Sequence, residues 1–132
     1  MPDTRRRDFM IAAATGAAAW SLPAASSLAQ PGKPMYGLIG KMRTTPGQRD
    51  AVVAFLLEGV KDMPGCLSYV VAHDPNDADA IWITEAWDSR ESHKASLALP
   101  GVQKAIAAAR PFIAGFGERF ETVPVGGQGL AR

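Results

Sequence analysis

The stretch IWITEAWDSRESHKASLALPGV, running from Ile81 to Val102, decides the fold. Its first half alternates with the period of a β-strand, in which successive side chains point to opposite faces. One predicted face carries Ile81, Ile83, Glu85 and Trp87, and the other carries Trp82, Thr84 and Ala86. The strand therefore presents two different faces, and each face holds one tryptophan.

The second half of the stretch predicts a short helix. Asp88 is expected to end the strand and cap the helix, and Glu91, three residues later, completes a capping box. His93 and Leu97 are four residues apart and therefore share a helical face. This segment is expected to bring two tryptophans and one histidine close together at a strand end.

The elements outside this stretch follow a regular order. A first strand is predicted over 35–43, and Thr45 caps a helix that begins with Pro46-Gly47-Gln48. A second strand covers 66–73, a polar turn covers 74–79, a further helix follows Pro100, and the last strand covers 116–125. Strand, helix, strand, strand, helix, strand is the ferredoxin-like split βαβ order. The sequence thus predicts an α+β fold, an antiparallel four-stranded sheet with helices on one face.

The predicted strands are apolar on both sides, although helices cover only one face of such a sheet. Exposed apolar surface costs roughly 25 cal/mol per Å², which favours covering the second face with another subunit. We therefore expect a homodimer packed sheet to sheet, with an aromatic-walled chamber between the copies. One of Trp82 and Trp87 is expected under the helices, and the other facing the chamber.

Residues 1–29 have the features of an export signal. Arg5, Arg6 and Arg7 precede an apolar stretch too short for a stable membrane anchor, and Ser27-Leu28-Ala29 offers small residues for cleavage. The order Arg6-Arg7-Asp8-Phe9-Met10 resembles the twin-arginine export signal. A periplasmic or secreted protein is therefore expected, with a linker at 30–35, one domain at 36–125 and a flexible tail at 126–132.

The composition narrows the classes of partner and cofactor. The 132 residues carry a formal net charge of +1 without a basic stripe, which argues against nucleic acid as a partner. Cys66 is the only cysteine, and the two histidines lack the spacing of metal ligands, so no metal site is predicted. No glycine-rich phosphate loop follows a strand, so no nucleotide cofactor is predicted either.

Four motifs carry a resemblance to a known family. They are PGCLSY at 64–69, HDPND at 73–77, TEAWDS at 84–89 and LPGVQ at 99–103. With these motifs, the chain from Tyr36 to Val125 resembles the antibiotic biosynthesis monooxygenase domain, which implies a dimeric α+β barrel. Haem-degrading relatives carry a Trp where this chain has Ser96, a His near Ile106 and an Asn in the first strand; the lack of all three disfavours haem degradation.

The resemblance implies a monooxygenase that needs no cofactor. Such an enzyme removes a proton from a quinol or phenol, and the substrate anion then reacts with O2, which requires an apolar pocket, a base and an oxyanion donor. His93 is the candidate base because its ordinary pKa lies near neutrality, although the family's usual histidine position is occupied by Ser96. The candidate substrate-binding residues are Trp82, Trp87, Tyr69, Ser96 and Arg119.

Each candidate also has a purely structural interpretation. His93 would be a partly buried histidine with a hydrogen-bonded ring, the tryptophans would be core residues, and Arg119 would be a solvated edge-strand charge. Tyr69 would bond a backbone group, and Glu85 would pair with Arg119 or Lys41. The alternatives to a monooxygenase are therefore a non-catalytic small-molecule binding dimer and a stress-related dimer whose barrel has lost its chemistry.

Overall fold

The structure, a computed structural model, describes residues 32–130. The predicted export signal at 1–29 and the last two residues of the predicted tail lie outside the described residues. In chain order the elements are β1 (Tyr36–Thr44), α2 (Arg49–Gly59), β2 (Cys66–His73), β3 (Ala80–Trp87), α3 (Arg90–Ser96), α4 (Pro100–Ala109), a 3-10 turn (Arg110–Phe112) and β4 (Ile113–Thr122).

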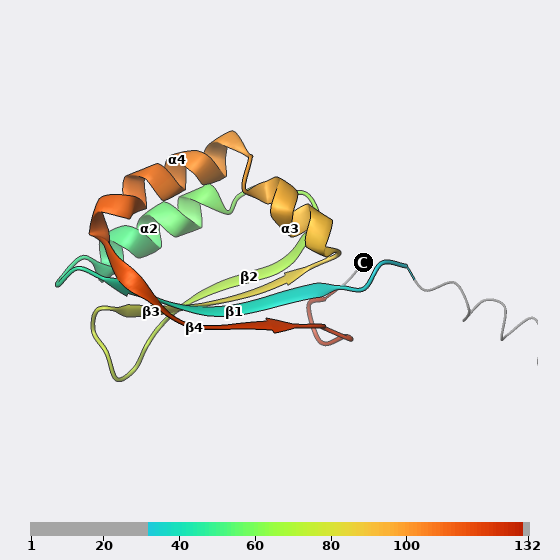
Figure 1. Ribbon diagram of the computed structural model, residues 1–132, viewed down its shortest axis with the longest axis horizontal. Helices are drawn as coiled ribbons and strands as arrows, with labels where there is room; N and C mark the ends of the chain where they lie inside the picture. Colours follow the sequence, from blue (N-terminus) through green and yellow to red (C-terminus); the bar gives the residue numbers. More distant parts are fainter. Residues whose placement is uncertain (1–31, 131–132) are drawn as a thin grey trace, which may run out of the picture. The chain divides into compact units, whose positions relative to one another are not determined.

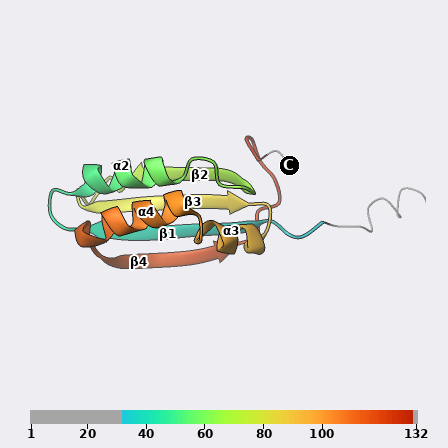
Figure 2. The ribbon, with the colours of Figure 1, turned by 90° about the horizontal axis from the view of Figure 1, so that it is seen from above.

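The four strands form one open antiparallel sheet in the order β2-β3-β1-β4. The three helices all lie on one face of this sheet, with α2 and α4 running side by side (Figures 1 and 2). The order of elements and the strand order are those of the ferredoxin-like split βαβ fold. The α+β fold expected from the alternating pattern of Ile81–Trp87 is therefore confirmed.

Helix α2 begins later than predicted. The sequence placed the cap at Thr45, but the helix starts at Arg49 and its N-cap, Gln48, makes no side-chain capping bond. Thr45 belongs to a turn instead, in which the Gln48 N–H donates to the Thr45 carbonyl oxygen at 3.1 Å. Gly47 in that turn has φ of 77°, a left-handed value that a right-handed helix cannot include. A Thr-Pro-Gly sequence thus forms the turn before the helix.

Helix α3 is capped by Ser89, so the prediction of Asp88 as the cap was wrong by one residue. The Ser89 hydroxyl oxygen accepts a bond from the Ser92 N–H at 3.2 Å. The Asp88 N–H is instead bonded to the carbonyl oxygen of Gly65 at 2.9 Å. This bond ties the loop after α2 to the end of β3, which fixes where α3 starts.

Strand β4 begins and ends three residues earlier than predicted, at Ile113–Thr122 and not at 116–125. Its register with β1 pairs Ile113 with Thr44 and Thr122 with Gly37. The strand ends before Pro124, whose missing N–H cannot continue a ladder. The pairing with β1, and not the hydrophobic pattern of the last strand, sets these limits.

The helix-covered face of the sheet holds the hydrophobic core. Residues paired across neighbouring strands share a face, and Met42 pairs with Ile81 as Tyr36 pairs with Trp87. The main buried cluster comprises Met42, Val52, Leu56, Ile81, Ile83 and Ala109, and a second cluster comprises Tyr36, Met63 and Trp87. Trp87 is therefore the tryptophan that lies under the helices.

The opposite face of the sheet has no helix over it and carries exposed apolar side chains (Figure 1). Ile39 pairs with Phe120 there, and Phe120 and Val70 are 54% and 51% exposed. Trp82 lies on this face, where its indole N–H donates to Asp74 Oδ2 at 2.8 Å. Lys41 pairs with the same carboxylate at 3.3 Å and lies 5.5 Å from the centre of the Trp82 ring. We call this surface the open face.

Candidate functional site

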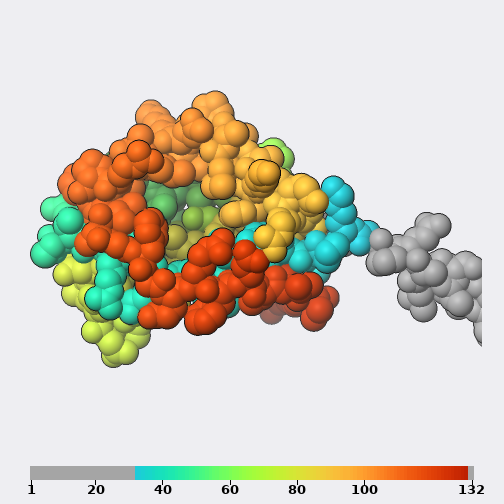
Figure 3. Space-filling view, viewed as in Figure 1, coloured from blue at the N-terminus to red at the C-terminus, as the bar shows by residue number. Residues whose placement is uncertain are grey.

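A cavity of about 340 Å³ lies inside one subunit, between the sheet and the helices. Figure 3 shows it as a hollow between α3 and α4 on one side and β4 on the other. The aromatic-walled chamber was predicted at the contact between two sheets. The described cavity lies on the other side of the sheet, under the helices, where its lining comes from all three helices and all four strands. Its walls are mostly apolar, and its polar side chains are Tyr69, Glu85, His93 and Ser96.

His93 lines the cavity and lies close to two aromatic rings, that of Trp87 in the cavity and that of Tyr36 outside it. Its ring centroid is 5.1 Å from that of Tyr36 and 5.4 Å from that of Trp87, which it meets edge to face at 74°. Its side chain is only 16% exposed. Burial lowers the pKa of His93, and the positive charges of Arg119 and Arg90 lower it further. These effects favour the neutral form of the imidazole.

Glu85 is the site residue whose place in the cavity sequence reasoning missed. Its side chain is 11% exposed, and its Oε1 accepts a bond from the Trp87 indole N–H at 3.1 Å and lies 4.0 Å from His93 Nε2. Burial raises the pKa of the Glu85 carboxyl, opposed by the Trp87 hydrogen bond and by Arg119. The expected pairing with Lys41 is wrong, because Lys41 lies on the open face and pairs with Asp74. The sequence held one clue to the buried position of Glu85: it is the one carboxylate on the strand face that also carries Ile81, Ile83 and Trp87.

Tyr69 and Ser96 also line the cavity. The Tyr69 hydroxyl makes no hydrogen bond to another of the described residues, and burial, followed by the nearby Glu85, raises its pKa. The Ser96 hydroxyl donates to the carbonyl oxygen of His93 at 2.6 Å, so its proton is already engaged within α3. Tyr69 thus offers a free polar group to a ligand, whereas Ser96 mainly supplies space.

Arg119 lies at an adjoining hollow of about 360 Å³, which shares Met42, Ile83, Glu85 and Phe116 with the cavity. Its guanidinium is 3.4 Å from Glu121. Of the predicted site residues, the structure therefore brings together His93, Trp87, Tyr69 and Ser96, with Arg119 near the edge. It separates Trp82, which lies on the opposite face of the sheet.

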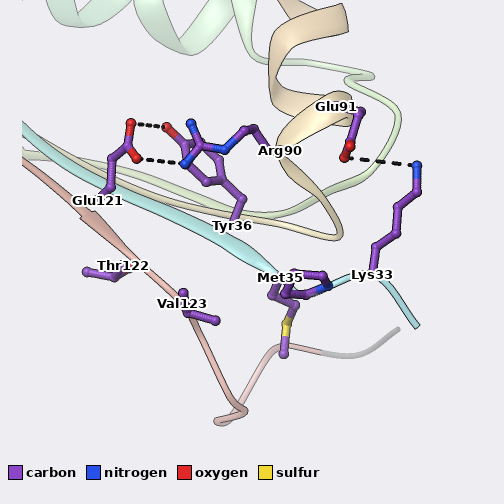
Figure 4. A pocket seen from close by; sticks show the side chains of 9 residues that line it. Lys33, Met35, Tyr36, Arg90, Glu91, Glu121, Thr122 and Val123 are labelled. Atoms are coloured by element: carbon purple, nitrogen blue, oxygen red, sulfur yellow. Dashed lines mark hydrogen bonds and ion pairs between the residues drawn. The ribbon is translucent and has the colours of Figure 1, made fainter. Parts of the chain in front are cut away.

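A second cluster of polar side chains, outside the cavity, contacts the Tyr36 side chain. The Tyr36 hydroxyl donates to Glu121 at 3.1 Å, Arg90 pairs with the same carboxylate at 2.8 Å, and the Arg90 guanidinium lies 4.6 Å from the Tyr36 ring centre. These side chains join the start of α3 to β4 and line a surface hollow of about 330 Å³ (Figure 4). The cluster holds the Tyr36 ring against His93.

The described residues show neither a metal centre nor a membrane-spanning helix. Within 32–130, no three His, Cys, Asp or Glu side chains lie close enough to hold a metal ion. In the same part of the chain, no helix combines the length and apolar character needed to cross a bilayer.

Comparisons with known proteins agree with the fold. A crystal structure of a candidate antibiotic biosynthesis monooxygenase from Chloroflexus aurantiacus J-10-fl is 72% identical in sequence, with a TM-score of 0.72; the match covers 74% of this chain and 99% of that one. A candidate enzyme of the same name from Caulobacter crescentus CB15 is 19% identical, with a TM-score of 0.65 over 71% of this chain and 92% of that one. A protein from Pseudomonas aeruginosa is 15% identical, with a TM-score of 0.64 over 74% and 100% of the two chains.

The two more distant structures support the fold alone. No match was found among curated proteins. The sequence pattern of the antibiotic biosynthesis monooxygenase family matches residues 35–108, more than half of the chain. The chain therefore belongs to the antibiotic biosynthesis monooxygenase family.

Proposed function

We propose that the protein is a cofactor-independent monooxygenase that oxidises a quinol-like or phenolic aromatic in the cavity beside His93. The family match and the names of the related structures support a monooxygenase-like function. The observation that carries the finer proposal is the cavity itself, which is mostly apolar, about 340 Å³ in volume, and lined by the His93 imidazole next to the Trp87 ring. Cavities of this size hold small ligands.

The chemistry requires a hydroxylated ring that gives up a proton. An aromatic substrate would lie against the apolar walls, with a hydroxyl group at His93 and a second oxygen within reach of Tyr69. Removal of the hydroxyl proton leaves an electron-rich anion, which passes electrons to O2. The apolar surroundings exclude water, so each hydrogen bond to the developing anion is stronger than in solution.

The open face supports a second proposal, that two copies pack sheet to sheet. Phe120 and Val70 are about half exposed there, next to Ile39 and Trp82, and exposed apolar surface of this kind marks an interaction site.

We also propose that residues 1–29 direct export to the periplasm or the medium. N-terminal sequencing of the mature protein tests this, since a protein that keeps its first residues would contradict it.

One observation favours the alternative of a non-catalytic binding module. The family's usual histidine position is occupied by Ser96, and its hydroxyl is bonded to a backbone carbonyl and cannot act as a base. A protein of this kind would hold the same aromatic ligands in the same cavity without consuming oxygen.

Oxygen uptake separates the two functions. We expect the wild-type protein to consume O2 with a reduced naphthoquinol or an anthrone, and His93→Ala to lose most of this activity. His73→Ala is the matched control, because His73 is an exposed histidine at the end of β2 that does not line the cavity. Equal rates in wild type and His93→Ala would remove His93 from the mechanism, and no uptake with any quinol would leave the binding module.

A further inference from the structure

Glu85 occupies a position that packing alone does not explain. It projects from the middle strand β3 into the cavity, and its paired neighbours on β1 and β2 are Leu38 and Tyr69. A carboxylate in such surroundings is costly unless several groups bond to it. Among the described residues, only the Trp87 indole donates a hydrogen bond to Glu85, at 3.1 Å. An apolar residue or a glutamine would fill this space at lower cost to stability.

The distance between Glu85 and His93 fits a third group between them. Glu85 Oε1 and His93 Nε2 are 4.0 Å apart, which is too far for a direct hydrogen bond. A hydroxyl oxygen about 2.8 Å from each atom would see them at an angle of about 90°. That angle suits a hydroxyl group that donates to one atom and accepts from the other.

We propose that Glu85 is a catalytic residue that accepts the hydroxyl proton of the substrate, while His93 donates a hydrogen bond to the same oxygen. This assignment rests on the proposed function and changes the role of His93 from base to donor. The substrate O–H bond breaks, its proton goes to Glu85 Oε1, and the electron pair stays on the substrate oxygen. The cavity keeps the same net charge, because the negative charge moves from the carboxylate to the substrate.

The surroundings of the pair favour this direction of transfer. Burial raises the pKa of Glu85 and makes it a stronger base, whereas burial and the nearby arginines lower the pKa of His93 and keep it neutral. If His93 took the proton, a carboxylate and a new oxyanion would face each other at hydrogen-bonding range. The titratable groups around the pair come from four elements: Tyr36 of β1, Cys66 and Tyr69 of β2, Arg90 of α3, and Arg119 and Glu121 of β4.

The first test compares conservative variants in oxygen uptake. Glu85→Gln keeps the shape but cannot accept a proton, so kcat/KM should fall by about 100-fold or more. His93→Gln keeps an N–H donor and should retain more activity than His93→Ala. Glu58→Gln is the control, since Glu58 is an exposed glutamate that pairs with Lys61 away from the cavity. Glu85→Gln within threefold of wild type would overturn the assignment.

The pH profile identifies the base directly. In wild type, kcat/KM should rise with pH as Glu85 ionises, at a pH above the ordinary range of a glutamate because its pKa is raised. This rise should persist in His93→Gln and be absent from the residual activity of Glu85→Gln. The reverse pattern would assign the base to His93.

Ligand binding tests the contact between Glu85 and the substrate hydroxyl without any catalytic turnover. 2-Naphthol should bind Glu85→Gln at least fivefold more weakly than wild type, while 2-methoxynaphthalene, which has no hydroxyl proton, should bind both equally. Equal losses for both ligands, or none for 2-naphthol, would contradict a contact between Glu85 and the hydroxyl. A wild type that oxidises no quinol would refute the proposed function, and this comparison would still decide the role of Glu85.

Discussion

The open face offers the sharpest test of assembly, through the substitution Phe120→Ala. Phe120 is 54% exposed and lies beside Ile39 on the face without helices. An aromatic side chain buries roughly 200 Å² when fully covered, so about half of that, about 100 Å², is still available to a partner. At about 25 cal/mol per Å², each copy contributes about 2.5 kcal/mol to a sheet-to-sheet contact.

Two copies of Phe120 would together contribute about 5 kcal/mol, an upper bound because ordering and desolvation offset part of it. The dissociation constant should therefore rise by between about tenfold and a few thousandfold. Sedimentation equilibrium over a range of concentrations measures this change, and circular dichroism checks that the variant is folded.

Phe116→Ala is the matched control for this experiment. Phe116 lies on the same strand and is even more exposed, at 76%, but it pairs with Met42 and lines the cavity on the helix-covered side. Its removal should leave the dimer unchanged and weaken binding of an aromatic ligand. A wild type that is monomeric at micromolar concentration, or a Phe120→Ala dimer as tight as wild type, would refute the reasoning.

Three further predictions concern stability. Gly59→Ala should destabilise the protein by about 1–3 kcal/mol in urea unfolding, because a new methyl group would overlap the Ala105 side chain where α2 meets α4; Ala105→Gly should restore part of the loss. Glu85→Gln should leave the melting temperature unchanged or raised, since it removes a buried charge, and a clear fall would mean that the carboxylate is structural. Hydrogen bonds from the Asn76 N–H and the Trp82 indole hold the pKa of Asp74 at about 2. The Asp74 carboxylate therefore contributes its full stabilisation above about pH 4, and this stabilisation is lost as the pH falls toward 2. In acid unfolding, Asp74→Asn should lack this loss of stability between about pH 4 and pH 2.

Three of the four strands could be placed closely from the sequence. Strand β2 was predicted with its observed limits, and β1 and β3 within one residue, whereas β4 was misplaced because its pairing with β1 sets its limits. The helix starts were less predictable. Thr45 and Asp88 are both good caps in isolation, but a glycine turn and a bond to the Gly65 carbonyl engage these two segments.

The candidate site was only partly predictable for a different reason. His93, Trp87 and Tyr69 are expected from their residue types and spacing, and the structure brings them to one cavity. The side of the sheet on which the cavity lies depends on where the helices pack, which a strand pattern cannot specify. Glu85 was assigned to an ion pair because its burial arises only when β1, β2 and α3 surround it.

Tyr36 is both the first residue of the sheet and a neighbour of His93. If residues 1–29 are an export signal, only the predicted linker at 30–35 separates the cleavage site from Tyr36, so cleavage a few residues further along would reach the first strand. Loss of Tyr36 would take away the ring that lies 5.1 Å from His93, together with the hydroxyl that donates to Glu121.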